Sequence, residues 1–191
     1  MKVVAFNGSA RTDGNTALLI RRVLQVLEEE GLETELIQLA GKHIHGCNAC
    51  RTCYSTKNKR CVIEEDDVNA YIEKMIEADG IILGSSVYFS MMTPELKALA
   101  DRAFYVARAN DDLFKRKVGA AVVAVRRAGG MPTFDAINHF FLISQMIIPS
   151  SSYWNIGFGR KKGDVEGDEE SLRIMKDLGR NMAWLIKKLK T

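Results

Sequence analysis

The sequence lacks the features that mark a membrane or secreted protein. Among its 191 residues, no apolar run approaches the ~20 residues that a membrane-spanning helix needs. The first residues, MKVVAFNGS, lead directly into a strand pattern, without the apolar segment and cleavage site of a signal peptide. We therefore expect a cytoplasmic protein without membrane attachment, in a compartment where structural disulfides are uncommon.

The sequence also lacks a strong excess of charge of one sign, and it lacks segments that would divide it into domains. The formal net charge is +3, and Lys and Arg are scattered apart from short runs near Arg160 and at the C-terminus. This distribution argues against nucleic acid as a partner. No linker, repeat or low-complexity segment interrupts the chain, so we predict a single domain over residues 1–191, with a cysteine-rich loop insertion at about 41–65.

Short apolar runs alternate with segments of helical periodicity along the chain. The runs that indicate strands cover residues 2–8, 33–39, 79–89, 117–125 and 151–158. Helical spacing begins with Ile20, Val23, Leu24 and Leu27, and it returns over residues 66–78, 94–106, 131–147 and 168–189. This alternation predicts an α/β fold, a doubly wound five-stranded parallel sheet with helices on both faces.

Ligands of such sheets bind beyond the carboxyl ends of the strands, where the strand order reverses. The loop after the first strand, NGSARTDGNT (residues 7–16), opens a helix and so presents backbone N–H groups and the positive end of the helix dipole. It contains no G-x-G-x-x-G pattern, and Asn15 stands where a Walker motif has Lys, so neither NAD binding nor ATP hydrolysis is indicated. A phosphate monoester fits this loop better; an ordinary Gly/Ser-rich turn is the alternative.

The loops after the third and fourth strands offer groups that suit a planar ligand. Residues Ser86–Ser90 could border a ring, with an aromatic side chain beside it. The paired glycines Gly129–Gly130 let the backbone come close to a ligand, and Arg126 or Arg127 could place positive charge there. The alternatives are packing for the aromatic residues and a solvated surface position for an arginine.

All four cysteines lie in one segment, CNACRTCYSTKNKRC. Cys47, Cys50 and Cys53 form C-x-x-C-x-x-C, and Cys61 follows eight positions later. Thiolates select zinc, Cu(I) or iron–sulfur clusters, and the close spacing of the first three is typical of ferredoxin-type runs. Zinc remains a competitor, in which a histidine just upstream could replace a thiolate, and an empty loop is the third possibility.

These motifs resemble those of a known family. GSARTDGNT, SSVYFSMMTPELKALADR and RRAGG are similar to the flavodoxin-like NAD(P)H-dependent FMN reductases over about residues 1–160, although relatives often have Pro where this chain has Ser86. With the cysteine run after the second strand, the resemblance narrows to the iron–sulfur flavoproteins. It implies a flavodoxin-like fold, FMN, a [4Fe–4S] cluster and a homodimer or homotetramer, in which the cysteine loop of one subunit could lie against another.

The resemblance also implies roles for individual residues. The FMN phosphate would be held by Ser9, Arg11, Asn15 and Thr16. The isoalloxazine would be bordered by Ser86, Val87, Tyr88, Phe89 and Ser90, and its pyrimidine side by Arg127, Gly129 and Gly130. The cluster would be held by Cys47, Cys50, Cys53 and Cys61.

The expected function is that of a flavin-dependent oxidoreductase. Electrons would pass from a donor such as ferredoxin or NAD(P)H to a small acceptor such as a quinone or an oxygen species, without a general acid–base pair or a nucleophile on the protein. Two alternatives remain open: an NAD(P)H-dependent FMN or quinone reductase without a cluster, and a non-catalytic flavodoxin-fold module that senses redox state.

Overall fold

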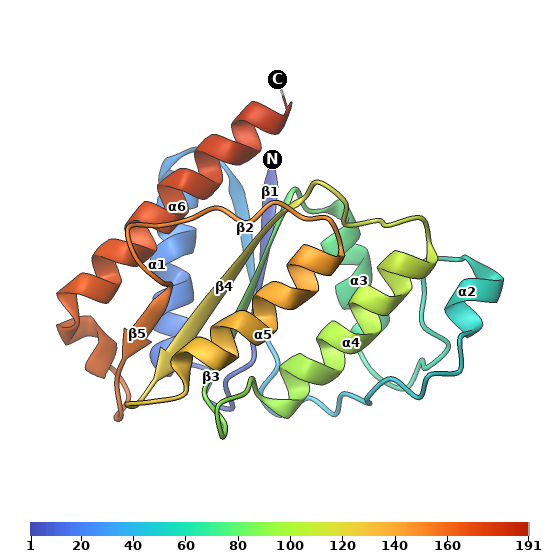
Figure 1. Ribbon diagram of the computed structural model, residues 1–191, viewed down its shortest axis with the longest axis horizontal. Helices are drawn as coiled ribbons and strands as arrows, with labels where there is room; N and C mark the ends of the chain where they lie inside the picture. The colour runs from blue at the N-terminus through green and yellow to red at the C-terminus, as the bar shows by residue number, and fades with distance from the viewer. Residues whose placement is uncertain (191) are drawn as a thin grey trace.

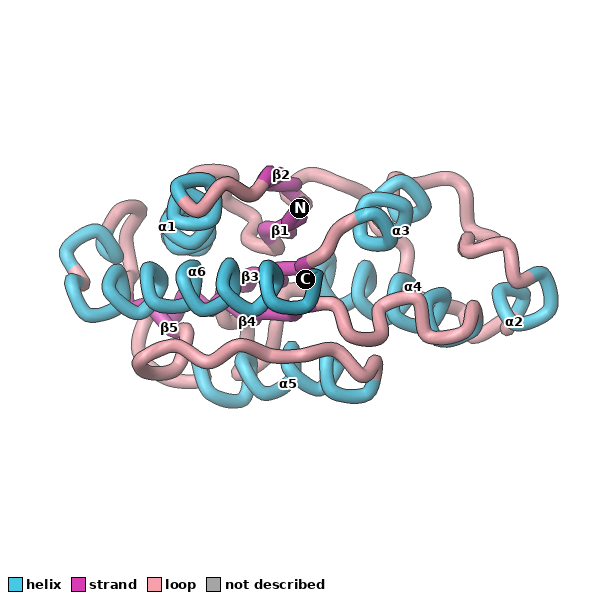
Figure 2. Tube along the Cα trace, turned by 90° about the horizontal axis from the view of Figure 1, so that it is seen from above, coloured by secondary structure: helices cyan, strands magenta, loops and turns pink. Residues whose placement is uncertain are grey.

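The computed structural model describes residues 1–190, which form a parallel sheet between two layers of helices (Figures 1 and 2). The elements follow in the order β1 (Lys2–Asn7), α1 (Asn15–Glu29), β2 (Glu33–Gln38), α2 (Thr52–Thr56), α3 (Val68–Glu77), β3 (Gly80–Ser86), α4 (Pro94–Ala109), β4 (Val118–Val125), α5 (Gly130–Ile143), β5 (Ile156–Phe158), a 3-10 turn (Asp164–Gly167) and α6 (Glu169–Lys190). The predicted α/β fold with five strands is confirmed.

In the strand order β2-β1-β3-β4-β5, the order in which successive strands are added reverses between β1 and β3. All four strand pairs are parallel, and Asn7 at the carboxyl end of β1 lies opposite Gln38 of β2 and Gly84 of β3. The carboxyl ends of the central strands therefore meet at one edge, where doubly wound sheets bind their ligands.

Each face of the sheet has its own apolar core. On one face α1 and α6 cover Val3 and Ala5 of β1, and on the other α3, α4 and α5 cover Val4 and Phe6. This alternation follows from the two-residue period of a strand, and the continuous apolar strands predicted by the sequence are buried on both sides. No helix within residues 1–190 is long and apolar enough to cross a lipid bilayer.

Several boundaries differ from those that the sequence predicts. Helix α5 ends at Ile143, because Gln145 has a φ of 56° and Ile147 pairs with Val118 as an isolated bridge. The last strand is reduced to Ile156–Phe158, since the residues before it form a turn. The short helix α2 within the cysteine loop was not expected, and Figure 1 shows it at the far side of α4 from the sheet.

Candidate functional site

The loop between β1 and α1 is shaped by side chains at the ends of β1 and β2. Asn7 Oδ1 accepts the N–H of Ser9 at 3.1 Å, and Gln38 Nε2 donates to the Ser9 carbonyl at 2.8 Å. Ser9 Oγ in turn accepts the N–H of Arg11 at 3.2 Å. Helix α1 then begins at Asn15 without a side-chain cap. Its first N–H groups are therefore available to an anion.

The same loop packs closely against the start of α4. Thr93 Oγ1 donates to the Gly8 carbonyl at 2.7 Å, and the Thr93 N–H donates to Ser85 Oγ at 3.0 Å. A Cβ on Gly8 would lie 2.7 Å from Cβ of Leu96, so only glycine allows this approach. Thr93 is the residue before α4, and its hydroxyl joins the two loops instead of capping its own helix.

The turns that follow β3 and β4 touch each other. Tyr88 and Met91 exchange backbone hydrogen bonds at 2.9 and 3.0 Å, and the residues between them, Phe89 and Ser90, have φ angles of 49° and 63°. Gly129, with a φ of 85°, lies so close that an added Cβ would be 2.8 Å from Ser90 Oγ. Positive φ at two consecutive non-glycine residues is uncommon and marks a turn held in place by its surroundings.

A cavity of about 210 Å³ opens where these loops meet. The predicted residues that line it are Ser9, Arg11, Asn15, Thr16, Ser86, Val87 and Tyr88. Arg126, one of the two arginines that the sequence offered, also lines it. The lining residues that sequence reasoning did not select are Ala10, Ala124, Gly159 and Arg160. The remaining predicted residues lie outside the lining: Phe89, Ser90, Arg127 and Gly129 in the adjoining turns, and Gly130 at the first position of α5.

The segment after β5 also reaches this cavity, because Asn15 holds it there. Asn15 Nδ2 donates to the Lys161 carbonyl at 2.9 Å, and Asn15 Oδ1 accepts the N–H of Gly163 at 2.9 Å. The Asn15 side chain is thus engaged by protein, and the residue can offer a ligand its backbone N–H. The anchored segment places Arg160 on the cavity wall.

Three arginines surround the cavity and are available to an anionic ligand. The guanidinium groups of Arg11, Arg126 and Arg160 have no hydrogen-bond or ion-pair partner within residues 1–190. Together with the uncapped start of α1, they supply the donors and the positive charge that a phosphate monoester requires. The residues present therefore fit the phosphate end of FMN.

All four cysteines line a second cavity, of about 20 Å³, between α2 and α4. Cys53 is buried, and burial together with the neighbouring thiols raises its pKa. Cys50 is exposed, and its pKa is lowered because the Thr52 hydroxyl donates a hydrogen bond to its sulfur at 3.3 Å. Residues up to fourteen positions apart in the sequence are thus gathered around one space.

Beside the cysteines lies a buried ion pair between Arg102 of α4 and Asp66. Both side chains are almost completely excluded from solvent. Burial alone would raise the pKa of Asp66, but the guanidinium of Arg102 and the N–H groups of His45 and Val68 hold it below its ordinary value. The cysteine loop is therefore attached to α4 by a charged contact.

The four cysteine sulfurs are suitable ligands for a metal that prefers sulfur, although the space between them is small. Within residues 1–190, no group of three or more His, Cys, Asp or Glu side chains is arranged to hold a metal ion, and a space of about 20 Å³ holds little more than one water. Neither His43 nor His45 lines it. Four thiols around one space are nonetheless the kind of ligands that iron–sulfur clusters take, and two of them, Cys47 and Cys50, are exposed.

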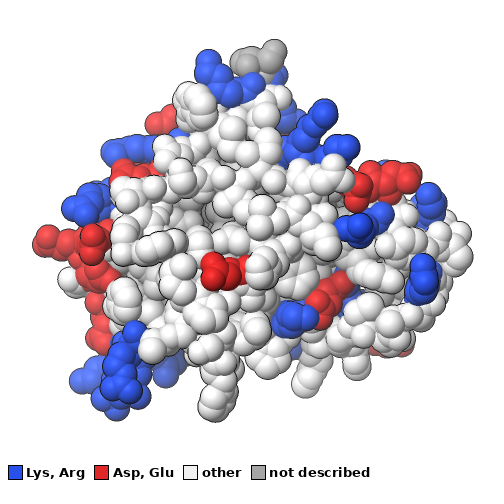
Figure 3. Space-filling model, in the orientation of Figure 1, with Lys and Arg blue, Asp and Glu red and all other residues white. Residues whose placement is uncertain are grey.

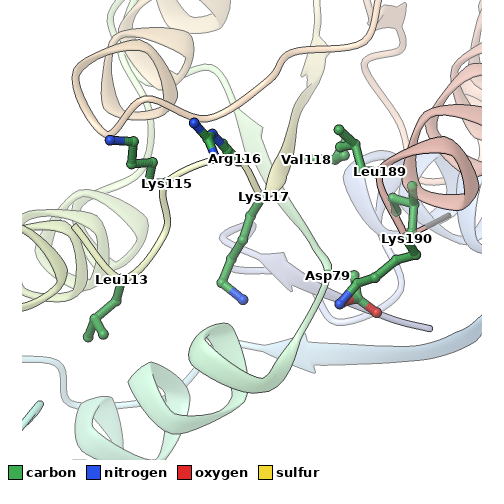
Figure 4. Close-up of a pocket in the computed structure, with 9 residues that line it drawn as sticks. Asp79, Leu113, Lys115, Arg116, Lys117, Val118, Leu189 and Lys190 are labelled. Atoms are coloured by element: carbon green, nitrogen blue, oxygen red, sulfur yellow. The ribbon is translucent and has the colours of Figure 1, made fainter. Parts of the chain in front are cut away.

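A larger cavity, of about 320 Å³, lies at the opposite edge of the sheet (Figure 4). Among its charged groups, Lys190 pairs with Asp79 at 2.7 Å, and Lys117 Nζ donates to the carbonyls of Ile76, at 2.8 Å, and Ala78. Burial lowers the pKa of Lys117. This cavity is at the amino ends of the strands, away from the converging loops.

Residues 1–161 match the family model described as NADPH-dependent FMN reductase. The chain belongs to this family. It is 40% identical to an iron-sulfur flavoprotein of Methanocaldococcus jannaschii over the whole of both chains, and 37% identical to an iron-sulfur flavoprotein of Methanosarcina thermophila over 87% of each. The family makes this chain an FMN-dependent flavoprotein and a flavin-dependent oxidoreductase.

Solved structures agree with the flavodoxin-like fold. RosB, in a structure with bound 8-demethyl-8-formylriboflavin-5'-phosphate, superimposes with a TM-score of 0.77 at 18% identity, covering 100% of this chain and 80% of its own. A flavodoxin from the domain Archaea gives a TM-score of 0.64 at 16% identity, covering 98% and 99% of the two chains. At these identities the likeness concerns the fold alone.

Proposed function

We propose that this FMN reductase family member is an iron–sulfur flavoprotein, with FMN in the cavity at the strand ends and a [4Fe–4S] cluster on Cys47, Cys50, Cys53 and Cys61. The observation that carries the proposal is that all four thiols line one cavity in a chain whose loop after β1 lines another, together with three arginines. The names of the relatives described above support it.

The residues around the flavin cavity at the strand ends have distinct roles. The N–H groups at the start of α1, with Ser9, Thr16 and Arg11, bind the phosphate, and Arg160 neutralises its second charge. Residues 86–90 border the ring on one side, while Gly129, Gly130 and Arg127 lie toward its pyrimidine side, as the family resemblance implies. When bound, FMN supplies transfer of a hydride or of single electrons, and the protein positions it.

The arginines also bear on the chemistry of the ring. Arg126, on the cavity wall, and Arg127, next to it in the sequence, place positive charge near the fourth strand's tip. Preorganised positive charge and backbone N–H groups stabilise negative charge that develops on a bound group during reduction. We expect the donor to be NAD(P)H or ferredoxin and the acceptor a small quinone or an oxygen species.

Helix α4 connects the two sites. Its preceding residue Thr93 contacts the phosphate loop at Gly8, and Arg102 contacts Cys61, nine positions and about 14 Å further along the helix axis. The cysteines line a cavity between α2 and α4, whereas the flavin cavity lies at the strand ends. Figure 1 shows α2 on the far side of α4 from the sheet. This separation favours a homo-oligomer in which the cysteine loop of one subunit approaches the flavin of another.

An exposed apolar face supports association of copies. The face that carries α5 and the segment after it shows few charged side chains (Figure 3). Its exposed large apolar residues are Leu142, Ile143, Tyr153, Trp154 and Phe158. Such patches on soluble proteins are frequently interaction sites. Light scattering of the purified protein should give the mass of a dimer or tetramer; a monomer at all concentrations would contradict this part of the proposal.

The cluster is tested by anaerobic purification and reconstitution with iron and sulfide. We expect flavin absorption bands with an added broad shoulder, close to four irons and four sulfides per chain, and loss of both from Cys53→Ala. Ser55→Ala, on the same short helix α2, is the matched control and should keep the shoulder. Flavin bands without iron, or zinc in place of iron, would favour a reductase without a cluster. The family membership leaves little support for a non-catalytic module.

A further inference from the structure

One charged side chain is buried completely beneath the cysteine loop. Arg102 of α4 is 1% exposed, and no fully buried side chain in residues 1–190 is larger. A guanidinium is rarely excluded from water unless every charge and most donors are satisfied, because its desolvation is costly. The hydrogen-bond and ion-pair partners of Arg102 must therefore offset the cost of burying its charge.

The guanidinium ties together both ends of the loop. Its Nη1 donates to the His45 carbonyl at 3.2 Å and pairs with Asp66, and its Nη2 donates to the Ile63 carbonyl at 2.9 Å. His45 precedes the first cysteine, whereas Ile63 follows the last. Asp66 also accepts the N–H of His45 at 3.0 Å, so the two ends and the ion pair form one closed network.

The same guanidinium contacts a cysteine sulfur. Arg102 Nε donates to Cys61 Sγ at 3.3 Å. The backbone of Cys61 is fixed separately by Asn69, which is 3% exposed: its Oδ1 accepts the Cys61 N–H at 2.8 Å, and its Nδ2 donates to the Cys61 carbonyl at 3.0 Å. Cys61 is thus held at both its main chain and its sulfur, while Cys47 and Cys50 are exposed.

The charge of Arg102 is already neutralised by an acidic partner, so its contact with the cysteine sulfur is an additional interaction. Asp66 neutralises the single charge of Arg102, yet the Nε–H remains directed at sulfur. Hydrogen bonds from charged donors are stronger than neutral ones, and hydrogen bonds to ligand sulfurs are one of the means by which a protein sets the potential of a cluster. Lysine could not make this set of contacts, because it lacks the planar fork of donors.

We propose that Arg102 is a positioning residue for the cysteine centre, which holds Cys61 toward the other three thiols and places a charged hydrogen-bond donor on one ligand sulfur. The inference rests on the proposed cluster, and no sequence motif indicates it. Because Arg102 holds the two ends of the loop together, Cys61 is fixed before a cluster binds, and the exposed Cys47 and Cys50 complete the site.

The test compares Arg102→Lys and Arg102→Gln with Arg108→Gln in the reconstituted protein. Arg108 lies on the same helix but donates only to the exposed Ile143 carbonyl, at 3.3 Å. Both Arg102 variants should keep FMN and release iron to a chelator about 10–100-fold faster, as is usual for second-layer ligand contacts. Because the lost donor stabilises the reduced centre, the midpoint potential of the cluster in Arg102→Lys should become more negative. Arg108→Gln should match the wild type in both measurements.

The possible outcomes distinguish the role of Arg102 from the proposed cluster on which it rests. A wild-type chain that takes up no iron and sulfide would overturn the cluster, and the role of Arg102 with it. A wild-type chain that loads a cluster, beside Arg102 variants with unchanged iron release and potential, would overturn the role of Arg102 alone. Variants that lose FMN together with iron, or that do not fold, would show a general structural role and would equally contradict the assignment.

Discussion

A methyl group added at Gly129 should disturb the flavin cavity, whereas the same methyl group at Gly31 should leave it intact. Both glycines have left-handed backbones, with φ angles of 85° and 81°. Alanine in that conformation costs about 1–2 kcal/mol, and this cost is common to Gly129→Ala and Gly31→Ala. The pair therefore separates backbone strain from contacts made by the new methyl group.

The contacts differ sharply between the two positions. A Cβ at Gly31 meets nothing within 4 Å, but at Gly129 it would lie 2.8 Å from Ser90 Oγ and 3.1 Å from Ser90 Cα. The hydroxyl can rotate away, whereas the backbone carbon cannot, so the turn after β3 must shift. Overpacking of this kind costs about 1–3 kcal/mol, which gives a total of about 2–5 kcal/mol for Gly129→Ala.

Urea unfolding of the apo-proteins and FMN titration followed by flavin fluorescence measure both effects. We expect Gly31→Ala to lose about 1–2 kcal/mol of stability with an unchanged Kd for FMN. Gly129→Ala should lose more, and its Kd should rise about tenfold, which corresponds to 1.4 kcal/mol of the packing cost. Equal losses of stability and equal FMN affinities in the two variants would refute the claim that the turns after β3 and β4 form one wall of the site.

Three further predictions concern single side chains. Asp66→Asn should cost about 3–5 kcal/mol at pH 7 because it leaves Arg102 buried without its partner. Since the pKa of Asp66 is lowered in the folded state, its contribution to stability is present above its unfolded pKa of about 4 and is lost as the pH falls through the folded pKa, so the urea midpoints of wild type and variant should approach each other as the pH is lowered below about 4. Asn15→Ala should release the segment 161–163 and weaken FMN binding severalfold in fluorescence titrations, while riboflavin binding changes less. Burial raises the pKa of Tyr71 to about 12, so a spectrophotometric titration should show one tyrosine, absent from Tyr71→Phe, that ionises well above the ordinary value of 10.

Much of the fold and part of the site follow from local sequence patterns. The apolar runs that became β1, β3 and β4 are buried on both faces, and burial on both faces is what makes such runs continuous. The loop after β1 could be located because a strand that ends in a polar turn and opens a helix has few other uses in this architecture. The clustering of the cysteines likewise needed only their spacing.

The parts that sequence reasoning missed depend on contacts between distant segments. Arg160 reaches the flavin cavity because Asn15, 145 positions earlier, binds the segment beside it. Arg102 lies in a helix whose periodicity gives no sign that an arginine would be buried, since its partners are on the cysteine loop. The spacing of Arg126 and Arg127 did not decide which one faces the cavity; Arg126 lines it.

Titration of the apo-protein with FMN and with riboflavin tests the central claim most directly. The loop after β1, the start of α1, Arg11 and Arg160 are assigned to the phosphate, which riboflavin lacks. The account predicts one FMN per chain and a Kd for riboflavin at least about 100-fold higher, equivalent to two charged hydrogen bonds of about 1.4 kcal/mol each. Equal affinity for the two compounds would contradict it, because the converging loops would then make no favourable contact with the phosphate.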